Sequence, residues 1–279
     1  MKKIIISILV SLFLYSFATN TNDLPLLDSV ITAISKINTL KFTILKKERV
    51  NGVYKDGETF MKIQHRPFKD YSKILSAKNK GMEVLYVTGK NGGDALINMN
   101  GFPFVNLNLD PKGTRMTENQ HHVVFHSGLE YFGKILKNIR DRYKEKLIIT
   151  ATPNSTLKGM TGTKVEVTVP DFGYIKYTSP QDETIINLAD RLYLNPRIIC
   201  DKNTTHPSFT SIVKKGTSIQ VPNAYCKKAI FFINKNNVPF SQHIYDEKGL
   251  FEEYIYTNLI VNPTFAADEF DEDYKDYGF

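Results

Sequence analysis

The histidines come closer than other residues in this sequence to forming a chemical site. His121 and His122 are adjacent, and His126 and Glu130 follow at short spacing. Zinc accepts imidazoles and carboxylates as ligands. We nevertheless predict no metal site, because the pair precedes a helix that we place from Ser127 onward, and adjacent loop residues seldom direct both rings at one ion. The pattern favours loop histidines that form local hydrogen bonds.

Other catalytic arrangements are missing from the sequence. It contains no Gly-x-Ser-x-Gly elbow, and no glycine-rich phosphate loop joins a strand to a helix. Neither cysteine stands in a catalytic context. Acidic residues gather at Glu252-Glu253 and over 268–276, but runs of this kind usually form solvated surface. We therefore predict a protein that is not an enzyme and uses no cofactor, with a metal hydrolase kept as an alternative to be checked.

The first 18 residues have the pattern of a cleavable signal peptide. Lys2 and Lys3 precede an apolar run over 4–17, and Ser16-Phe17-Ala18 supplies small residues for cleavage before Thr19. The apolar run is shorter than the ~20 residues that span a bilayer. We expect an exported protein of the periplasm or cell envelope, with no transmembrane segment in its mature chain. A retained membrane anchor is the alternative.

The length and charge of the chain limit its function. Removal of 18 of the 279 residues leaves 261, enough for one large β domain or two modest ones. The formal charge then falls from +7 to about +5, a mild excess spread over many lysines. We expect no nucleic-acid partner, because nucleic-acid binders concentrate basic residues on one surface and an exported chain rarely meets nucleic acid. Attraction to anionic lipid headgroups or wall polymers is compatible with this charge.

The two cysteines, Cys200 and Cys226, are candidates for a disulfide. In an oxidising compartment the bridge would close a loop of about 26 residues and stabilise the fold by roughly 3 kcal/mol on the chain-entropy model. The alternative is two separate thiols, since the sequence does not show whether the two Cα atoms come close enough.

The spacing of apolar residues predicts two helices among many strands. Apolar residues at intervals of three and four predict helices over 27–37 and 129–143, and Ser127-Gly128-Leu129-Glu130 has the pattern of a capping box. Alternation of period two predicts an antiparallel meander from Leu40 to Ile97, and further strands over 163–169 and 228–259. The sequence thus predicts an α+β fold in which amphipathic helices cover a sheet.

Residues 174–223 interrupt the strand pattern with a unit of their own, which we predict as strand, helix, helix, strand. Asp182-Glu183-Thr184-Ile185, Leu188-Ala189, Lys215-Gly216 and Ile219-Gln220-Val221-Pro222 resemble a LysM module, a βααβ family that usually binds N-acetylglucosamine polymers such as peptidoglycan. The resemblance implies a glycan-binding groove. Its residues would be Thr184, Ile185, Asn203 and Ile212. The alternative is a module that decorates the main domain and binds nothing.

The rest of the mature chain, residues 19–173 and 224–279, has a broader resemblance. A helix, a continuous antiparallel meander, a second helix and returning strands resemble the LolA/LolB-like half-barrels of lipoprotein localisation. Gln64-His65-Arg66-Pro67-Phe68-Lys69, Lys80-Gly81-Met82-Glu83-Val84-Leu85-Tyr86 and Tyr245-Asp246-Glu247-Lys248-Gly249-Leu250-Phe251-Glu252 resemble an uncharacterised envelope family with that fold. The resemblance implies a fold more securely than an activity.

These features predict an envelope binding protein. A curved sheet closed by two amphipathic helices makes an apolar cavity for a lipid or lipoprotein, and the LysM-like module would contact peptidoglycan. Six candidate lining residues follow from the strand pattern: Phe60, Tyr71, Leu85, Tyr86, Leu96 and Leu107. These six would otherwise be ordinary core residues. The alternative function is a structural, wall-associated scaffold without a lipid ligand.

Overall fold

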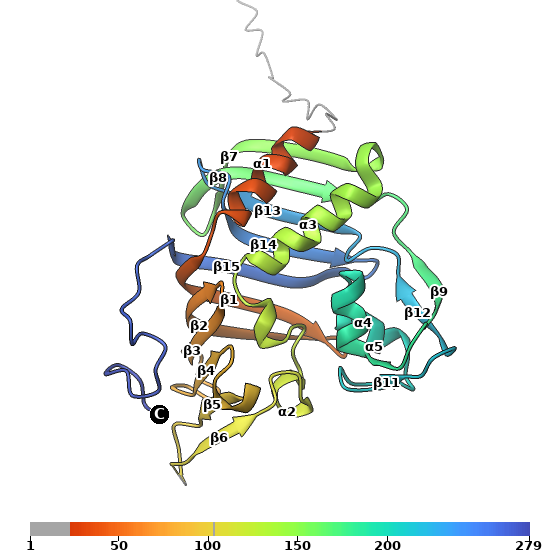
Figure 1. The fold of residues 1–279 in the computed structure, drawn as a ribbon. Helices are drawn as coiled ribbons and strands as arrows, with labels where there is room; N and C mark the ends of the chain where they lie inside the picture. Colours follow the sequence, from red (N-terminus) through yellow and green to blue (C-terminus); the bar gives the residue numbers. More distant parts are fainter. Residues whose placement is uncertain (1–22, 103) are drawn as a thin grey trace, which may run out of the picture.

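The computed structural model describes residues 23–102 and 104–279. The predicted signal peptide, residues 1–18, and the predicted cleavage site before Thr19 lie outside the described residues. The described chain runs from a helix into a large sheet, crosses the sheet as a second long helix, and completes the sheet after an insertion (Figure 1). The predicted α+β class with an antiparallel sheet is confirmed.

Eleven antiparallel strands form the main sheet, in the order β6-β5-β4-β3-β2-β1-β15-β14-β13-β8-β7. The strands are β1 (Thr39–Val50), β2 (Val53–His65), β3 (Phe68–Ile74), β4 (Glu83–Val87), β5 (Ala95–Asn98), β6 (Asn106–Leu109), β7 (Ile148–Leu157), β8 (Met160–Thr168), β13 (Lys228–Ile233), β14 (Pro239–Asp246) and β15 (Gly249–Val261). The first and last of the long strands pair directly, with Leu40 opposite Val261 and Glu48 opposite Glu252. The C-terminal strands therefore join the N-terminal meander to the β7–β8 hairpin.

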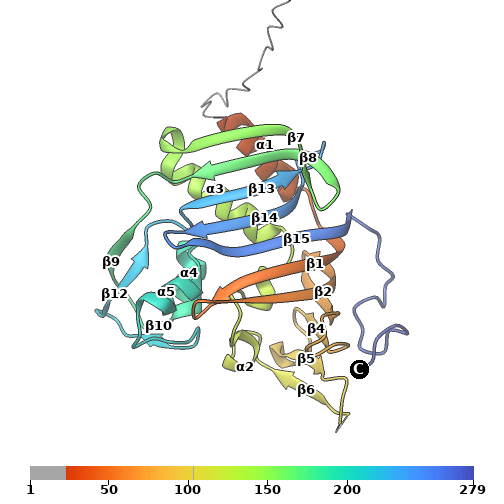
Figure 2. The ribbon, with the colours of Figure 1, turned by 180° about the vertical axis from the view of Figure 1, so that it is seen from behind.

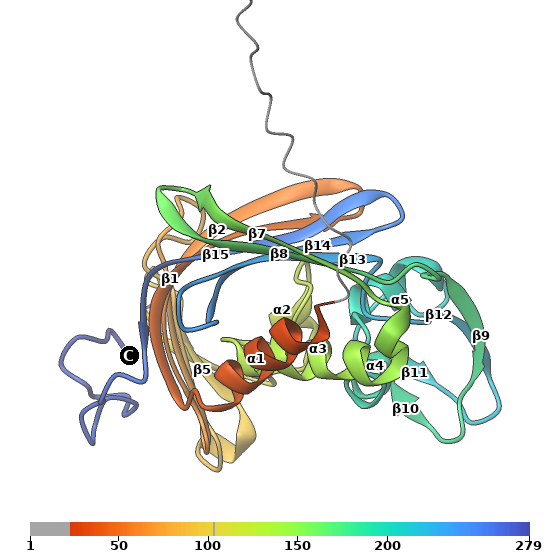
Figure 3. The same cartoon turned by 90° about the horizontal axis from the view of Figure 1, so that it is seen from above.

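Two helices, α1 (Leu24–Ser35) and α3 (Glu130–Tyr143), pack against each other on the concave face of the sheet (Figure 3). Their crossing is close, since a Cβ atom on Gly133 would lie 2.7 Å from a methyl carbon of Ile34. The predicted helical stripes are confirmed. Most of their residues are buried in the main core: Leu27, Val30, Ile34, Ile37, Leu129, Phe132, Leu136 and Ile139. Within residues 23–102 and 104–279, no helix is both long and apolar enough to cross a bilayer.

The predicted capping box at the start of α3 is wrong. The helix begins at Glu130, and Leu129 at the N-cap position makes no side-chain cap hydrogen bond. Glu130 instead accepts from Arg66 at 3.0 Å and pairs with Lys134 at 2.8 Å. An ion pair with a neighbouring turn thus replaces the reciprocal cap.

The insertion has the predicted order of elements. It consists of β9 (Tyr174–Thr178), β10 (Glu183–Thr184), α4 (Ile185–Leu192), α5 (Pro196–Lys202), β11 (Ile212–Val213) and β12 (Ser218–Pro222), and β9 pairs with β12 in antiparallel fashion. Its apolar core includes Ile185, Leu188, Ile199 and Val221, but Val123 of the main domain belongs to the same cluster. The insertion is therefore packed onto the main domain.

The candidate disulfide is not formed, and the alternative of two separate thiols holds. Cys200 and Cys226 are both free and buried. Cys200 lies in the core of the insertion, whereas Cys226 lies in the core of the main sheet. Burial raises the pKa of the Cys200 thiol to about 12. The two cysteines are therefore protonated thiols in two different cores.

The C-terminal tail, residues 262–279, returns along the convex face of the sheet beside β2 to β5 (Figure 2). Phe270 is buried there with Tyr71 and Leu85. The rings of Tyr71 and Tyr277 stack with centroids 3.6 Å apart. This end of the sheet is consequently covered on both faces.

Candidate functional site: a cavity with a buried polar end

The concave side of the N-terminal half of the sheet forms a cavity of about 680 Å³. Its walls come from β1 to β6, from β14 and β15, from the first turns of α3, from residues 115–128 and from Tyr225. Four of the six methionines of the chain line it: Met61, Met82, Met99 and Met116. Methionine is unbranched and flexible, so it adapts to ligands of different shape. The volume falls within the range of about 300–1,000 Å³ that is typical of small-molecule sites.

The structure places only one of the six predicted lining residues in this cavity wall, Leu107 of β6. Tyr86 lies on the same face of the sheet, in the apolar cluster beside the cavity. The other four pack on the convex face against the C-terminal tail: Phe60, Tyr71, Leu85 and Leu96. The prediction chose the wrong face for these four. The tail covers the convex face of β3 to β5, so both faces of these strands carry apolar side chains. The alternation of apolar residues therefore does not show which face lines the cavity.

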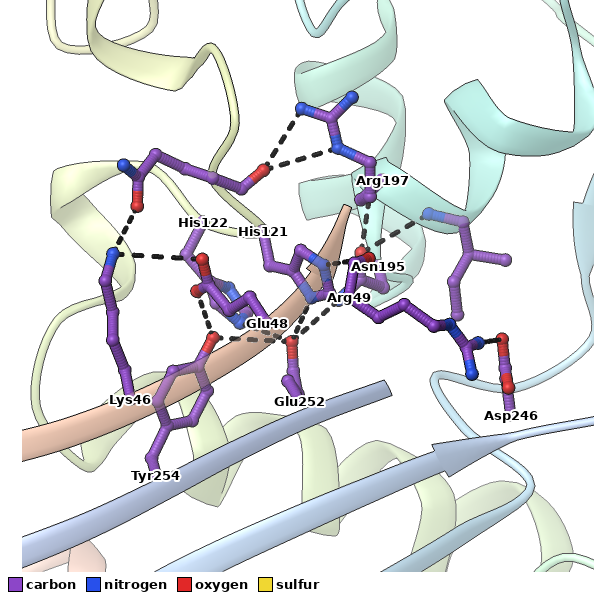
Figure 4. A network of polar contacts seen from close by, with 12 residues as sticks. Lys46, Glu48, Arg49, His121, His122, Asn195, Arg197, Asp246, Glu252 and Tyr254 are labelled. Atoms are coloured by element: carbon purple, nitrogen blue, oxygen red, sulfur yellow. Dashed lines mark hydrogen bonds and ion pairs between the residues drawn. The ribbon is translucent and has the colours of Figure 1, made fainter. Parts of the chain in front are cut away.

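Two buried carboxylates form a polar end of the cavity lining. Figure 4 shows the polar side chains around them. Glu48 of β1 and Glu252 of β15 are opposite each other in the strand register, and only 3% and 1% of their surfaces are exposed. The Tyr254 hydroxyl donates to Glu48 at 2.5 Å. Lys46 Nζ lies 3.8 Å from Glu48. A buried carboxylate without such partners is strongly destabilising, so the surrounding donors are a condition of this arrangement.

His121 is bound between two acceptors. Its Nδ1 lies 2.9 Å from Glu252 Oε2, and its Nε2 lies 3.0 Å from the carbonyl oxygen of Arg49. Both partners are hydrogen-bond acceptors, so the ring is held in place between the two. The prediction of loop histidines with local hydrogen bonds is wrong for His121, which is fully buried and whose carboxylate partner lies 131 residues further along the chain. It holds in part for His122, which contacts His126 four residues away.

His122 and His126 continue this network toward the insertion. His126 Nε2 donates to Asp190 of α4 at 2.8 Å, and its Nδ1 lies 3.2 Å from Nδ1 of His122. Burial lowers the pKa of His126 to about 4 despite the hydrogen bond to Asp190, so the ring is neutral and its Nδ1 accepts from His122. His122 also donates from Nε2 to Glu252 at 3.1 Å. Burial alone would lower the pKa of His122, but attraction to Glu252 outweighs it and raises the pKa.

Glu252 is the centre of the network. Burial by itself would raise its pKa, but the charges and hydrogen bonds of His122 and His121 outweigh burial and hold the pKa far below its ordinary value. The other carboxylate oxygen accepts from the Tyr225 hydroxyl at 2.9 Å. Burial, reinforced by Glu252, raises the pKa of both Tyr225 and Tyr254, so the two phenols remain donors. Glu252 is thus an ionised carboxylate surrounded by donors.

The insertion supplies two further residues to this network. Asn195, at the start of α5, donates from its amide to Tyr225 at 3.1 Å and to Glu252 at 3.3 Å. The Arg197 guanidinium donates to the carbonyl oxygen of Gln120 at 3.2 Å. Asn195 and Arg197 are both buried. Residues 174–223 therefore take part in the polar end of the cavity.

The four residues predicted for a glycan groove are only partly together. Thr184 of β10 lies opposite Ile212 of β11, and Ile212 is 54% exposed. Ile185 is fully buried in the core of the insertion, so it cannot line a groove. The Asn203 amide donates to the carbonyl oxygens of Ile199 and Gln220 and thereby joins α5 to β12. Thr184 and Ile212 remain as the surface pair.

Sequence reasoning missed most members of the network, among them Glu48, Asn195, Tyr225, Glu252 and Tyr254. The position of Glu252 could have been predicted from the sequence. It is two and four residues before Tyr254 and Tyr256 in a predicted strand, so its side chain points to the same face of the sheet as theirs. Treating Glu252-Glu253 as one acidic run hid this, since adjacent strand residues point to opposite faces. In the described ranges 23–102 and 104–279, no group of three or more His, Cys, Asp and Glu side chains is arranged to hold a metal ion.

Comparison with solved structures gives only distant likenesses. The chain of the Pseudomonas aeruginosa MucA/MucB complex is 12% identical, with 88% of this chain and 59% of that chain covered and a TM-score of 0.41. Mycobacterium tuberculosis lipoprotein LppX is 11% identical, and the alignment covers 88% of this chain and 100% of LppX with a TM-score of 0.43. A LolA superfamily protein from Nitrosomonas europaea is 9% identical, with 90% and 98% covered and a TM-score of 0.31. This chain thus spans less than two thirds of the MucB relative.

Comparison with curated proteins gives no match. A family model matches residues 37–182, a range that includes α3 and the strands from β1 through β9. The matched range contains Glu48, His121, His122 and His126 of the polar end and ends before Asn195 and Glu252. The chain belongs to the family described as "Protein of unknown function (DUF1571)".

Proposed function

We propose that this chain is an exported binding protein of the cell envelope whose cavity holds the apolar part of a lipid or lipoprotein. The observation that carries the proposal is the cavity of about 680 Å³ with four methionines in its wall. Aliphatic side chains complete the lining, among them Ile44, Val84, Ile97 and Leu109. A ligand with a flexible apolar chain would fit such a wall.

The polar end favours binding over catalysis. A general base needs a lone pair that is free to take a proton, and a nucleophile needs a base beside it. Here Glu252 accepts from His121, His122 and Tyr225, and Glu48 accepts from Tyr254. These groups are committed to one another, so we assign them the structural role of closing the cavity. The protein is not an enzyme under this proposal.

Native mass spectrometry of protein purified from its own envelope tests the cavity ligand. A co-purifying lipid is expected, and the mature mass also shows whether the chain begins at Thr19. A matched pair of variants locates the ligand: Met82→Trp places an indole in the cavity, whereas Met160→Trp changes a methionine of the β8 strand that packs with Phe232 and Phe240 instead. Only Met82→Trp should displace the lipid. Equal lipid content in the two variants would contradict the assignment.

A second proposed role is contact with peptidoglycan through the LysM-like segment 174–223. The pairing of the half-buried Thr184 with Ile212, which is 54% exposed, is the observation in its favour. Ile212→Asp should reduce pelleting with isolated peptidoglycan, while Ile175→Asp, which changes a 47% exposed residue on β9, should not. Unchanged pelleting in both variants would contradict a role of this pair in peptidoglycan binding. A protein free of lipid that pellets with isolated peptidoglycan would favour the alternative of a wall-associated scaffold.

A further inference from the structure

An apolar tip stands at the far end of the half-barrel. Between β5 and β6, Phe102 is 91% exposed, Phe104 is 80% exposed and Val105 is 50% exposed. The two phenylalanine rings lie with their centroids 6.4 Å apart at right angles, so they face solvent as a pair. Single exposed apolar residues are common, whereas clusters of large ones mark surfaces that bind something. This connection lies at the lower end of the molecule in Figure 1.

Basic side chains stand beside this tip. The Asn100 amide donates to the carbonyl oxygen of Lys80 at 3.1 Å, which ties the tip to the turn that carries Lys78 and Lys80. Both lysines are exposed. In the C-terminal tail, Glu269 pairs with Lys62 at 2.5 Å and Asp271 pairs with Lys90 at 2.7 Å, so these two acidic residues are neutralised by other lysines. The turn beside the tip thus presents positive charge.

The tip is continuous with the mouth of the cavity. Met99 and Leu107, which flank the tip on its two sides, line the cavity. Lys78 and Asn79 of the basic turn line it as well. A surface that received the tip would therefore also meet the opening of the cavity.

We propose that Phe102, Phe104 and Val105 insert into the interface of an anionic lipid bilayer, with Lys78 and Lys80 against the headgroups. Aromatic rings and basic residues together are the combination that lipid interfaces favour, because the rings leave water while the charges stay hydrated and meet the anionic surface. A protein partner would explain the apolar rings equally well but gives no reason for the adjoining lysines and the cavity mouth. The inference deepens the proposed function, since it names the surface from which the cavity takes its ligand.

The sequence offers a clean optical test because it contains no tryptophan. Phe102→Trp introduces a single indole at the tip. On addition of vesicles of phosphatidylglycerol and phosphatidylethanolamine, its emission should shift to shorter wavelength, and brominated acyl chains should quench it. Ile175→Trp, at the 47% exposed position on β9 of the insertion, should show neither change. An indole at the tip that stays in water would overturn the inference.

Sedimentation with the same vesicles gives the second measurement. Phe102→Ser/Phe104→Ser should weaken binding at least about tenfold, because burial of even one phenylalanine ring corresponds to more than a tenfold change in partition. Lys78→Ala/Lys80→Ala should weaken binding to anionic vesicles and leave any binding to phosphatidylcholine vesicles unchanged. The exposure of Phe102 and Phe104 means that their replacement should leave the fold intact, which thermal unfolding checks.

The two proposals fail separately. The Phe102→Ser/Phe104→Ser variant should retain the lipid that native mass spectrometry detects when that lipid is supplied in detergent. If the wild type holds lipid in the cavity but does not bind vesicles, the inference is wrong and the proposed function stands. If it binds vesicles but holds no lipid in the cavity, the proposed function is wrong and the membrane-binding tip stands. If the serine variant instead abolishes self-association of the wild type and does not change vesicle binding, the tip is an interface between copies and the inference is wrong.

Discussion

His121 Nδ1 lies 2.9 Å from Glu252 Oε2, and both side chains are buried. The pair joins the loop before α3 to strand β15, and the same carboxylate oxygen accepts from His122. Replacing a whole buried ion pair by apolar residues is often harmless, but removing one partner leaves a charge without compensation. The network therefore stabilises the fold only as a complete set.

Glu252→Gln should lower the free energy of unfolding by about 3–5 kcal/mol, because glutamine keeps the shape but leaves His122 without its counter-charge and His121 without its carboxylate acceptor. Urea unfolding followed by circular dichroism measures the change. The matched control is Glu253→Gln on the opposite face, where the carboxylate is partly exposed and pairs with His243 at 3.0 Å. Its expected cost is about 1 kcal/mol or less. Equal costs in the two variants would show that no buried charge pair exists at Glu252.

His126 should make stability depend on pH. Its pKa in the folded state is about 4, below the ordinary value of 6.5, so the unfolded chain binds the proton first as the pH falls. The stabilising contribution is present above about pH 6.5 and is lost as the pH falls toward 4. Between about pH 7.5 and 4.5, the stability of the wild type relative to His126→Gln should fall by about 2–3 kcal/mol.

Groups that titrate in this interval and do not contact His126 cancel in that comparison. Burial lowers the pKa of His65 to about 4 and raises the pKa of Asp70 to about 7, and both residues are present in the two proteins. A stability difference that stays constant with pH would mean that the folded and unfolded states protonate His126 alike. Urea midpoints at several pH values provide the measurement.

The sequence predicted the elements well and the site poorly, for one physical reason. Periodicity reports local patterns, so the stripe of α1 and the strand order of the insertion follow from it. It does not report what covers a face. Tyr71 and Leu85 were assigned to the cavity although the tail buries them, and Glu252 was assigned to the surface although two histidines from another part of the chain neutralise it. Long-range pairing decides both outcomes, and a local pattern does not contain it.

The C-terminal tail should be essential for solubility. Truncation after Asn262 would uncover apolar side chains of the convex face that the tail buries, among them Tyr71 and Leu85. The expected result is greater binding of an environment-sensitive apolar dye and aggregation that rises with concentration. Tyr277→Ala, which removes the ring stacked on Tyr71, should cost about 1–3 kcal/mol. The exposed Lys275→Ala should change stability by no more than about 0.5 kcal/mol. A truncated protein that stays monomeric with unchanged dye binding would contradict this prediction.

Asn195 should couple the insertion to the cavity. Asn195→Asp keeps an oxygen that can accept from the backbone of Arg197, so the start of α5 is retained, but it removes the amide donor and sets a carboxylate 3.3 Å from Glu252. Like charges in a buried site repel strongly. We expect a loss of stability that grows as the pH rises above about 4, because the new carboxyl ionises freely in the unfolded chain but only against the charge of Glu252 in the folded one. Asn187→Asp on the exposed face of α4 is the control and should have little effect. Equal behaviour of the two variants would place Asn195 outside the network.

Excision of residues 174–223 is the strongest test of the same coupling. The ends of the segment are close, since the backbone of Asn223 donates to Gly173 at 2.9 Å, so a short Gly/Ser linker can join them without strain. Closeness of the ends alone would allow the remainder to fold unchanged. The contacts argue otherwise: excision removes Asp190 from His126, Asn195 from Glu252 and Arg197 from Gln120, three hydrogen bonds that reach into the main domain. The remainder should therefore unfold at a lower urea concentration than the full chain. It should also lose cavity lipid, because the polar end would open to water. A remainder as stable as the full chain, with its lipid retained, would show that 174–223 is an independent module and that the network serves the insertion rather than the cavity.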